Sequence, residues 1–530
     1  MNKRTTLICA AIGASAALAG IFPQQSPTAG QDTVIPVAQA RALKPQYATT
    51  ANSEITVTVD LTQEQIEKAR GRVRANRPLE EPEQTGKRPA DANRQSGNPL
   101  TLSDAYRQAA ESVKEAHAKP YKDFGKGART ATASDGSRMS MGLAASYDLN
   151  ESTVGYPVGN TPPAVLESLC FNGTAEFEAI IDRFAACGRT KLTANYYKVE
   201  STTGTREYMG TNTGLVQLYT QQYNNERSTR MFAKMQKDSV TYDWGWWDNI
   251  WTAPGVDLTV IGNCFGNTAG CSATGSPITL TWENWNSVDT WYNWNANSSE
   301  AYGLGRDKLG AHGTHVEFYT DTGEYSSESR ASLSRRLVRC DSAAYIYADW
   351  QKGCVFLETI PRMMYSRAAD SPHKGVADHI YRAQNQPDLT YPTSTTSKSI
   401  PGKYVAGDYY AAGLHRLHEN FHLTTMNANT SHKDQACTST GEYSTTGLPL
   451  PLRPEAGVED CDEYPFRSTL EGASNTDWDF SVYPVDLSQN RSAGNTLMNY
   501  VRNHRILAWD DTLPDPANDN DRYYVQIVDF

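Results

Sequence analysis

The feature that most restricts how this chain can fold is a run of alternating apolar and polar residues within 141–345. The alternation is clear at 192–199, 256–260 and 278–282, and turns rich in glycine and asparagine separate these segments. Successive side chains of a strand point to opposite faces, so the pattern indicates antiparallel strands that bury one face. We therefore predict an antiparallel β-sandwich-like middle domain at 141–345, in which only 164–184 has helical spacing.

Residues 1–40 have the organisation of an export signal. Lys3 and Arg4 precede an apolar run at 7–22, and small residues suited to cleavage are present. The run is short for a membrane span, and no other stretch is long and apolar enough to cross a bilayer. The sequence predicts a secreted, extracellular protein with a signal peptide region at 1–40 and no membrane contact.

Residues 41–140 are polar, charged and poor in aromatic side chains. A capping-box pattern at 62–65 precedes apolar residues at helical spacing, and a second helix is expected at 103–117. Between them, 77–99 combine prolines with charges of both signs, which is typical of a linker. We predict a partly ordered helical stalk or linker at 41–140.

Outside the signal the chain carries an even number of cysteines and no Cys-x-x-Cys pair. This usage argues against a zinc ribbon or a thioredoxin-type site and, in an oxidising compartment, indicates structural disulfides. The sequence alone leaves the connectivity open, and we expect neighbours in the chain to pair. The expected pairs are Cys170 with Cys187, Cys264 with Cys271, Cys340 with Cys354 and Cys437 with Cys461.

The C-terminal part of the chain, 354–530, mixes short strand-like segments with helical ones. Strands are expected at 354–357, 479–485 and 523–528, and helices at 376–384 and 494–506. This mixture predicts an α/β domain with a mixed sheet plus helices. The whole chain is therefore expected to be multidomain.

An acidic stretch organises this C-terminal part. It reads Cys461-Asp462-Glu463-Tyr464-Pro465-Phe466, and Glu471-Gly472 and Gln489-Asn490-Arg491 follow it. Carboxylates together with a side-chain amide offer hard oxygen ligands, which suit Mg²⁺ or Mn²⁺. An arginine beside such a site is a usual partner for a phosphate.

These residues resemble the NucA/NucB family of secreted bacterial deoxyribonucleases. The family pattern of Asp-Glu-(Trp/Tyr)-Pro, Glu-Gly and Asn-Arg-x-x-Gly is matched at 462–465, 471–472 and 490–494. An upstream His-Ile helix of the family is matched at 378–383. The resemblance covers 354–530 and implies a deoxyribonuclease domain there, with DNA as its substrate.

The hypothesis that follows is metal-assisted hydrolysis of a phosphodiester. Asp462 and Glu471 would hold a Mg²⁺ or Mn²⁺ ion directly or through water, with Asn490 as a neutral oxygen ligand. Glu463 would share the metal or orient water.

Three further residues complete the hypothesis. His379 would activate the attacking water, because an imidazole exchanges protons near neutral pH. Arg491 would clamp a phosphate oxygen, and Arg467 would pair with Glu463 or meet the substrate.

The charge of the chain argues against strong DNA binding. The net charge is −11, and residues 354–530 hold 14 Lys/Arg against 23 Asp/Glu, a net of −9. Affinity for phosphates normally comes from basic side chains. We therefore expect weak substrate binding that depends on salt and metal and has little sequence specificity.

A zinc metallopeptidase is one alternative. His418-Glu419-Asn420-Phe421-His422 fits H-E-x-x-H, in which two histidines one helical turn apart hold zinc and the glutamate activates water. His415 adds a third imidazole, and a third ligand would have to be an acid such as Glu442 or Glu455.

A non-catalytic polymer- or cell-wall-binding protein is the other alternative. Its basis is a group of tryptophans in the middle domain, whose flat rings either stack on carbohydrate or fill the core of the sandwich. They are Trp244, Trp246, Trp247, Trp251, Trp282, Trp285, Trp291 and Trp294.

Overall fold

The computed structural model describes residues 53–59, 100–118, 150, 152–171, 176–199, 206–245, 253–266, 270–321 and 325–529. The export signal predicted at 1–40 and the helix predicted after 62–65 lie outside these ranges. None of the helices in the described part of the chain is long and apolar enough to span a bilayer.

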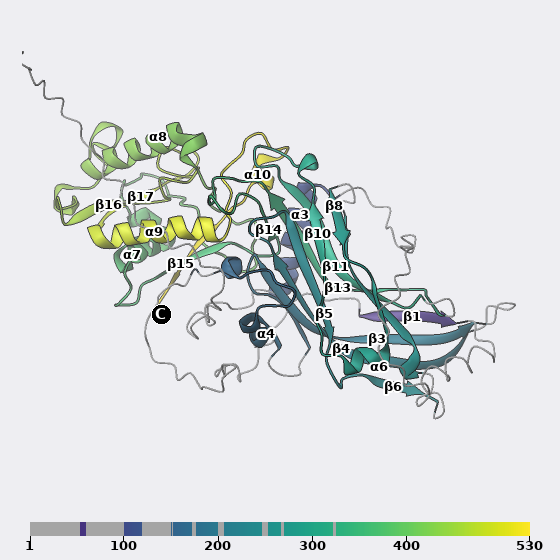
Figure 1. Cartoon of the computed structure of the whole chain (residues 1–530). Coiled ribbons are helices and arrows are strands. Elements are labelled where there is room, and N and C mark those ends of the chain that lie inside the picture. Colours follow the sequence, from purple (N-terminus) through teal and green to yellow (C-terminus); the bar gives the residue numbers. More distant parts are fainter. Residues whose placement is uncertain are drawn as a thin grey trace, which may run out of the picture. The chain divides into compact units, whose positions relative to one another are not determined.

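The larger sheet contains nine strands among these residues (Figure 1). In hydrogen-bonding order they are β12 (Tyr325–Ser327), β1 (Glu54–Val59), β3 (Ala185–Val199), β4 (Arg206–Gln222), β5 (Ser228–Met235), β10 (Tyr292–Ser298) and β8 (Cys271–Thr274), with β2 (Phe177–Ile180) beside β3 and β6 (Thr241–Trp244) beside β4. On β3 the side chains of Leu192, Ala194 and Tyr196 are buried and those between them are more exposed. The alternation read from the sequence therefore marks the buried face.

In the described part of the chain, the second sheet contains five strands, and it packs on the first. Its order is β14 (Gly353–Phe356), β13 (Ala331–Asp341), β11 (Gly310–Tyr319), β7 (Asp257–Phe265) and β9 (Ile278–Thr281). Val260, Val316 and Leu333 of this sheet share one buried cluster with Leu218 and Met231 of the larger sheet. The antiparallel sheets predicted for the middle of the chain are thus present, and they enclose a common core.

The helix predicted at 164–184 is only partly correct. Helix α4 ends at Phe171, and residues 177–180 form strand β2, which pairs with β3. A short apolar segment fits a buried strand as well as a helix, so its spacing alone cannot separate the two. Residues 177–180 form a strand because they pair with β3.

The region before the middle domain contributes a strand as well as a helix. β1 pairs in parallel with β3, so residues 54–59 belong to the larger sheet and not to a stalk. The helix predicted at 103–117 is confirmed as α3 (Leu102–Ala118). Ala105, Ala109 and Val113 of α3 are buried, which gives the helix one apolar face against the protein.

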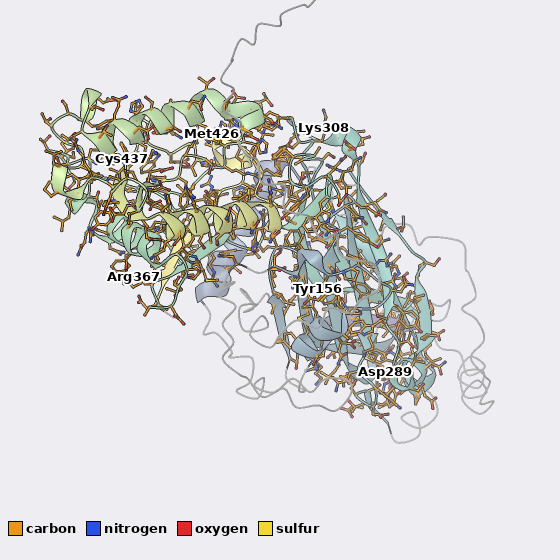
Figure 2. The ribbon with its side chains drawn as sticks, turned by 60° about the vertical axis from the view of Figure 1, so that its left-hand side comes forward. Tyr156, Asp289, Lys308, Arg367, Met426 and Cys437 are labelled. Carbon is orange, nitrogen blue, oxygen red and sulfur yellow. A yellow bond between two sulfur atoms is a disulfide. The ribbon has the colours of Figure 1, made fainter. Side chains whose placement is uncertain are left out.

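The C-terminal part mixes two small sheets with helices. β15 (Arg362–Ser366) pairs in parallel with β18 (Tyr524–Val528), and β16 (Glu459–Tyr464) pairs with β17 (Ser481–Asp486) in the antiparallel sense. The helices are α7 (Lys374–Asn385), α8 (Glu419–Thr438), α9 (Leu487–Asn503) and the short α10 (Pro516–Asp519). Met426 and Cys437 mark α8 in Figure 2. The strand predicted at 354–357 is present as β14, but it pairs with β13 in the five-stranded sheet.

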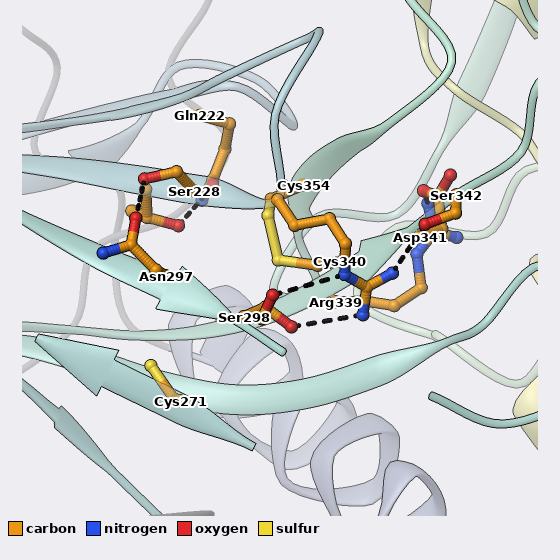
Figure 3. The surroundings of a disulfide bond; sticks show 12 residues. Gln222, Ser228, Cys271, Asn297, Ser298, Arg339, Cys340, Asp341, Ser342 and Cys354 are labelled. Atoms are coloured by element: carbon orange, nitrogen blue, oxygen red, sulfur yellow. Dashed lines mark hydrogen bonds and ion pairs between the residues drawn. A yellow bond between two sulfur atoms is a disulfide. The ribbon is translucent and has the colours of Figure 1, made fainter. Parts of the chain in front are cut away.

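All four predicted disulfides are present. Cys170 bonds to Cys187, Cys264 to Cys271, Cys340 to Cys354 and Cys437 to Cys461. Cys340 and Cys354 lie directly opposite each other on β13 and β14, and Figure 3 shows their surroundings. The bond between Cys437 and Cys461 ties α8 to β16 and so to the acidic stretch.

The described tryptophans of the middle domain fill the interior. Trp244, Trp282, Trp285, Trp291 and Trp294 are all buried, and each indole N–H donates to a protein oxygen. Buried rings cannot stack on a sugar, so these five side chains fill the core and do not form a carbohydrate-binding surface. Trp246, Trp247 and Trp251 lie outside the described residues.

A buried group of charges joins the β sheets to the C-terminal part. Asp521, just before β18, bonds to Arg183 and to Arg339 of β13, and Arg505, just after α9, bonds to Asp341 of β13. All five side chains are buried. The chain from β1 to β18 is therefore held together by charge pairs as well as by apolar packing.

Candidate active site

Asp462 and Glu463 of the sequence motif lie on β16, which forms a two-stranded sheet with β17, and α7 contacts this sheet. The register places Asp462 opposite Tyr483 and Glu463 opposite Val482. Val376 and Ile380 of α7 are buried in the same cluster as Tyr464 of β16 and Val485 of β17. This packing brings His379 of α7 to Asp462, although 83 positions of chain separate them.

His379 contacts both Asp462 and Ser481. Its Nδ1 lies 2.6 Å from Asp462 Oδ2, and its Nε2 lies 2.8 Å from Ser481 Oγ. A carboxylate only accepts hydrogen bonds, so Nδ1 donates to Asp462 and Nε2 accepts from the Ser481 hydroxyl. The order Asp–His–Ser is that of a nucleophilic triad, but Ser481 is 0% exposed and the His379 side chain 1% exposed. The three groups therefore fix the orientation of the Asp462 carboxylate.

A second carboxylate–imidazole pair lies on the loop segments beside these strands. Glu471 Oε1 lies 2.7 Å from His415 Nδ1, and Glu471 Oε2 accepts the backbone N–H of His415 at 2.9 Å. The Glu471 side chain is buried, whereas the His415 side chain is 14% exposed. Trp509 packs edge-on against the His415 ring, with 4.9 Å between ring centroids. Glu471 thus holds the ring of His415 through one oxygen and its backbone N–H through the other.

Glu463, the neighbour of Asp462, has a perturbed acidity. Burial, and after it the negative charge of Asp462, raises the pKa of Glu463 to about 7, although the nearby Lys433 and Arg467 oppose the shift. The backbone N–H of Arg467 donates to Glu463 Oε1 at 3.1 Å. Glu463 therefore changes its protonation state near neutral pH, within one residue of Asp462.

Replacing Glu463 with glutamine should flatten the pH dependence of stability. The folded state holds this proton more tightly than the unfolded chain, so wild-type stability should fall by about 1–3 kcal/mol as pH rises from about 4.3 to 7. The amide oxygen of glutamine still accepts from the Arg467 N–H, and the variant has no charge to bury. Urea denaturation at pH 5 and pH 8 measures the difference. Glu459→Gln on the same strand is the control, and equal pH dependence in wild type and Glu463→Gln would contradict the assignment.

The two predicted substrate-binding arginines lie in different settings. Arg467 Nε donates to Thr430 Oγ1 at 2.8 Å and its Nη2 to Asn427 Oδ1 at 3.3 Å, so α8 holds its guanidinium. Arg491 is exposed on α9 and forms no ion pair with any described residue. Only Arg491 is therefore free to meet a phosphate without first breaking hydrogen bonds.

Asn490 and Arg491 lie in the first turns of α9, which begins earlier than the sequence predicts. Asp486 caps the helix by accepting the backbone N–H groups of Ser488 and Gln489, both at 3.0 Å. Gln489 Oε1 accepts the backbone N–H of Gly375 at 2.6 Å and ties the start of α9 to α7. A capping aspartate eight residues before the predicted start explains the difference.

Asp462, Glu471 and Asn490 stay a predicted ligand set. Across the described ranges, no three His, Cys, Asp or Glu side chains come together in a way that could hold a metal ion. Glu471 directs both oxygens at His415. Direct coordination of a cation by Glu471 would therefore use the lone pairs that these two hydrogen bonds leave free.

The H-E-x-x-H segment does not form the helical pair that a zinc peptidase needs. His418 is the N-cap of α8 with extended backbone angles, and His422 has non-helical angles at a kink. His422 Nδ1 accepts the backbone N–H of His418 at 3.2 Å, and His418 Nδ1 accepts that of Asn420 at 3.3 Å. The rings therefore cap the helix and do not converge on a common ion.

His415 is the residue of this site that sequence reasoning did not place. No local motif marks it, and its partner Glu471 lies 56 positions further along the chain. We considered it only as a third imidazole for zinc. Its pairing becomes visible once the segment at 414–416 bridges to Tyr523, Thr469 and Ala508.

Comparison with known proteins points to one family. The model of the family Deoxyribonuclease NucA/NucB matches residues 412–511. The matched segment contains Asp462, Glu471, Arg491 and His415, whereas His379 precedes it. The resemblance predicted for the C-terminal part is therefore confirmed. No curated protein and no solved structure matches the chain.

Proposed function

We propose that this chain is a secreted deoxyribonuclease that hydrolyses DNA phosphodiester bonds with little sequence specificity and with the help of a divalent cation. The observation that carries the proposal is the position of the family match. Residues 412–511 contain two acids, Asp462 and Glu471, and each is hydrogen-bonded to an imidazole. Carboxylates and imidazoles are the side chains that hydrolytic sites use for acid–base chemistry and for orienting one another. Four disulfides agree with an extracellular location.

The side chains of the site fall into two sets. One set orients other side chains, and the other can contact the substrate. His379 uses both ring nitrogens inside the protein, so its role is to orient Asp462. Only Oδ2 of Asp462 is taken by this contact, and Oδ1 receives no hydrogen bond from the described residues. Asp462 therefore presents one fixed, charged oxygen to the site.

Two exposed arginines supply positive charge in this acidic region. Arg382 of α7 lies over the ring of Tyr483, 4.8 Å from its centroid, and that ring stacks on His379 at 5.8 Å. Like Arg491, Arg382 forms no ion pair with a described residue. Both guanidinium groups are therefore available for phosphate oxygens, and the aromatic ring beside Arg382 can also contact a base.

The test is a nicking assay with the full chain on supercoiled plasmid. We expect conversion to open-circular and linear DNA, at least about 100-fold slower in EDTA and restored by Mg²⁺ or Mn²⁺. The physical reason is that a divalent cation offsets the repulsion between phosphates and a region whose net charge is −9. Absence of cleavage under all conditions would refute the nuclease, and cleavage that EDTA leaves unchanged would refute the cation requirement alone.

The alternatives receive less support. A zinc peptidase would need His418 and His422 on one continuous helix, and α8 is capped and kinked at these residues. A carbohydrate-binding surface would need exposed indole rings, and the five described tryptophans of the middle domain are buried. Casein and cell-wall polymers in the same assay series provide the negative controls.

A further inference from the structure

Arg416 is a buried arginine of the C-terminal part that lacks an acidic partner. The nearby Arg505 shows the usual arrangement, because its Nε and Nη2 donate to the two oxygens of Asp341 at 2.8 and 2.6 Å. Arg416 is 7% exposed, and its guanidinium makes a single hydrogen bond to the described residues, from Nη1 to the Ile506 carbonyl at 2.8 Å. No described acid forms an ion pair with it. A buried cation without a counter-ion is unfavourable for folding, so its retention needs an explanation.

Arg502, in the last turn of α9, is a second guanidinium without an acceptor. Its Cζ lies 5.6 Å from the centroid of the Tyr347 ring, and its Nε is buried with no hydrogen-bond partner in the part of the chain that the structure describes. Arg416 Cζ lies 5.5 Å from the ring of Tyr345, two positions earlier on the same loop. Burial lowers the pKa of Arg416, and the positive charge of Arg502 lowers it further. Arg416 and Arg502, called the arginine pair below, therefore lie within reach of each other's charge.

His418 adds a neutral hydrogen-bond donor beside the arginine pair. Its ring centroid lies 4.8 Å from that of Tyr345, which Arg416 also contacts. His418 Nδ1 accepts the backbone N–H of Asn420 at 3.3 Å, so the proton of the neutral ring is on Nε2. Burial and then the arginine pair lower the pKa of His418 to about 4, so the ring is neutral at pH 7. His418 and Arg502 are both partly exposed, which leaves the group accessible from solvent.

The acids around this group are engaged with other partners. Asp307 accepts from the Tyr345 hydroxyl at 2.6 Å and lies 3.7 Å from Arg306 Nε. Asp510 accepts the backbone N–H of Arg306 at 2.6 Å, and Glu419 is exposed to solvent. These acids match the charge of Arg306, and they leave the arginine pair without an anion of its own.

We propose that Arg416, Arg502 and His418 form a phosphate-binding site. Two guanidinium groups offer paired donors to the oxygens of a phosphate, and the imidazole N–H adds a further one. All three residues lie in the segment that matches the nuclease family. The backbone of Arg416 also bridges to Thr469, so a short stretch of chain joins this site to the candidate active site.

The phosphate can come from two sources. One is a backbone phosphate of bound DNA, and the other is free inorganic phosphate, which presents the same oxygens. Occupation by DNA rests on the proposed nuclease function, and it would add cationic contacts in a region whose net charge is −9. Binding of inorganic phosphate does not depend on that function, so the two sources can be tested separately.

The first measurement is thermal unfolding of the full chain in rising sodium phosphate, with sodium chloride keeping the ionic strength constant. We expect a saturable rise in Tm of at least about 2 °C for the wild type, because a ligand that binds only the folded state stabilises it. Arg502→Gln should lose this rise. Its guanidinium makes no hydrogen bond to a described residue, so the variant should fold. Arg416→Gln should lose the rise as well, and Arg502→Gln covers the case in which changing the buried side chain unfolds the protein.

Arg453→Gln is the matched control. It makes the same chemical change at an exposed position, and the neighbouring Leu452 packs beside Cys437, at the opposite end of α8 from His418. This variant should keep the wild-type response to phosphate and the wild-type KM for DNA.

Steady-state plasmid cleavage distinguishes the two sources. If a DNA phosphate occupies the site, Arg502→Gln should raise KM by about 10-fold with kcat unchanged, and the dependence of log KM on log salt should weaken by about 1. If only free phosphate binds, KM should stay the same while the rise in Tm is lost.

Arg502→Gln that keeps both the phosphate response and the KM of the wild type would overturn the site and leave the nuclease standing. A wild type that responds to phosphate through Arg502 but never cleaves DNA would support the site and overturn the nuclease. A wild type that shows neither a phosphate response nor cleavage would overturn both.

Discussion

Replacing Asp521 with asparagine should lower the free energy of unfolding by about 3–5 kcal/mol, the cost of breaking a buried ion pair from one side. Asp521 Oδ1 accepts from Arg183 Nη2 at 3.0 Å, and its Oδ2 accepts from Arg339 Nη1 and from the backbone N–H of Leu507. Tyr106 of α3 donates to the same carboxylate at 3.1 Å. Asparagine removes the charge, which leaves the buried guanidinium of Arg183 without its counter-ion and that of Arg339 paired with Asp341 alone.

The stabilisation of the folded state by the Asp521 carboxylate should decrease as pH falls. Burial alone raises the pKa of Asp521, but Arg183 and Arg339 outweigh burial and hold this pKa well below its usual value. A carboxylate with a lowered folded-state pKa stabilises the protein above its unfolded pKa, and the contribution is lost as pH falls. The difference between wild type and Asp521→Asn should therefore be full at pH 7 and shrink below about pH 4.

Urea denaturation followed by circular dichroism measures this difference. Asp477→Asn is the control, because Asp477 is exposed and the substitution is chemically identical. A loss below about 1 kcal/mol for Asp521→Asn at pH 7 is what a surface pair would give. That result would show that the β sheets and the C-terminal part are not held together through this carboxylate.

Local patterns in the sequence were sufficient to predict the strands and helices that bury only one of their faces. The alternation at 192–199 marks the buried face of β3, and the helical spacing at 376–384 marks the buried face of α7. The cysteines paired with their neighbours because each pair lies within 24 positions, where short segments bring the two sulfurs together. The acidic motif also predicts Asp462 and Glu471 as site residues, and the structure places each beside an imidazole.

Contacts between distant segments could not be predicted in the same way. Arg183 and Asp521 are 338 positions apart, and β1 becomes part of a sheet by pairing with β3 and β12, both of which lie far along the chain. No periodicity encodes such pairings, because they depend on how complete elements pack. For the same reason the sequence identified Glu471 as an acid of the site but could not show that His415 occupies both of its oxygens.

Asp462→Asn should reduce plasmid cleavage by about 100-fold or more while the protein stays folded. The asparagine oxygen can still accept a hydrogen bond from His379 Nδ1–H, whose distance is 2.6 Å in the wild type. The substitution therefore keeps the geometry of this hydrogen bond and removes only the negative charge of residue 462. The site then lacks the fixed negative oxygen that we place against the reacting phosphate and its cation. Asp460→Asn, two residues earlier on β16, makes the same chemical change outside the His379 contact and should leave cleavage unchanged.

Variants at His379 separate orientation from charge. If His379 acts only by holding Asp462, then His379→Gln, whose amide can donate in place of Nδ1–H, should keep more activity than His379→Ala. If instead His379 accepts the proton of water, glutamine and alanine should be equally poor, because neither side chain exchanges protons near pH 7. The buried ring, bonded at one nitrogen to Asp462 and at the other to Ser481, leads us to expect the first result. Equal losses would return His379 to the water-activating role that the mechanistic hypothesis from the sequence gives it.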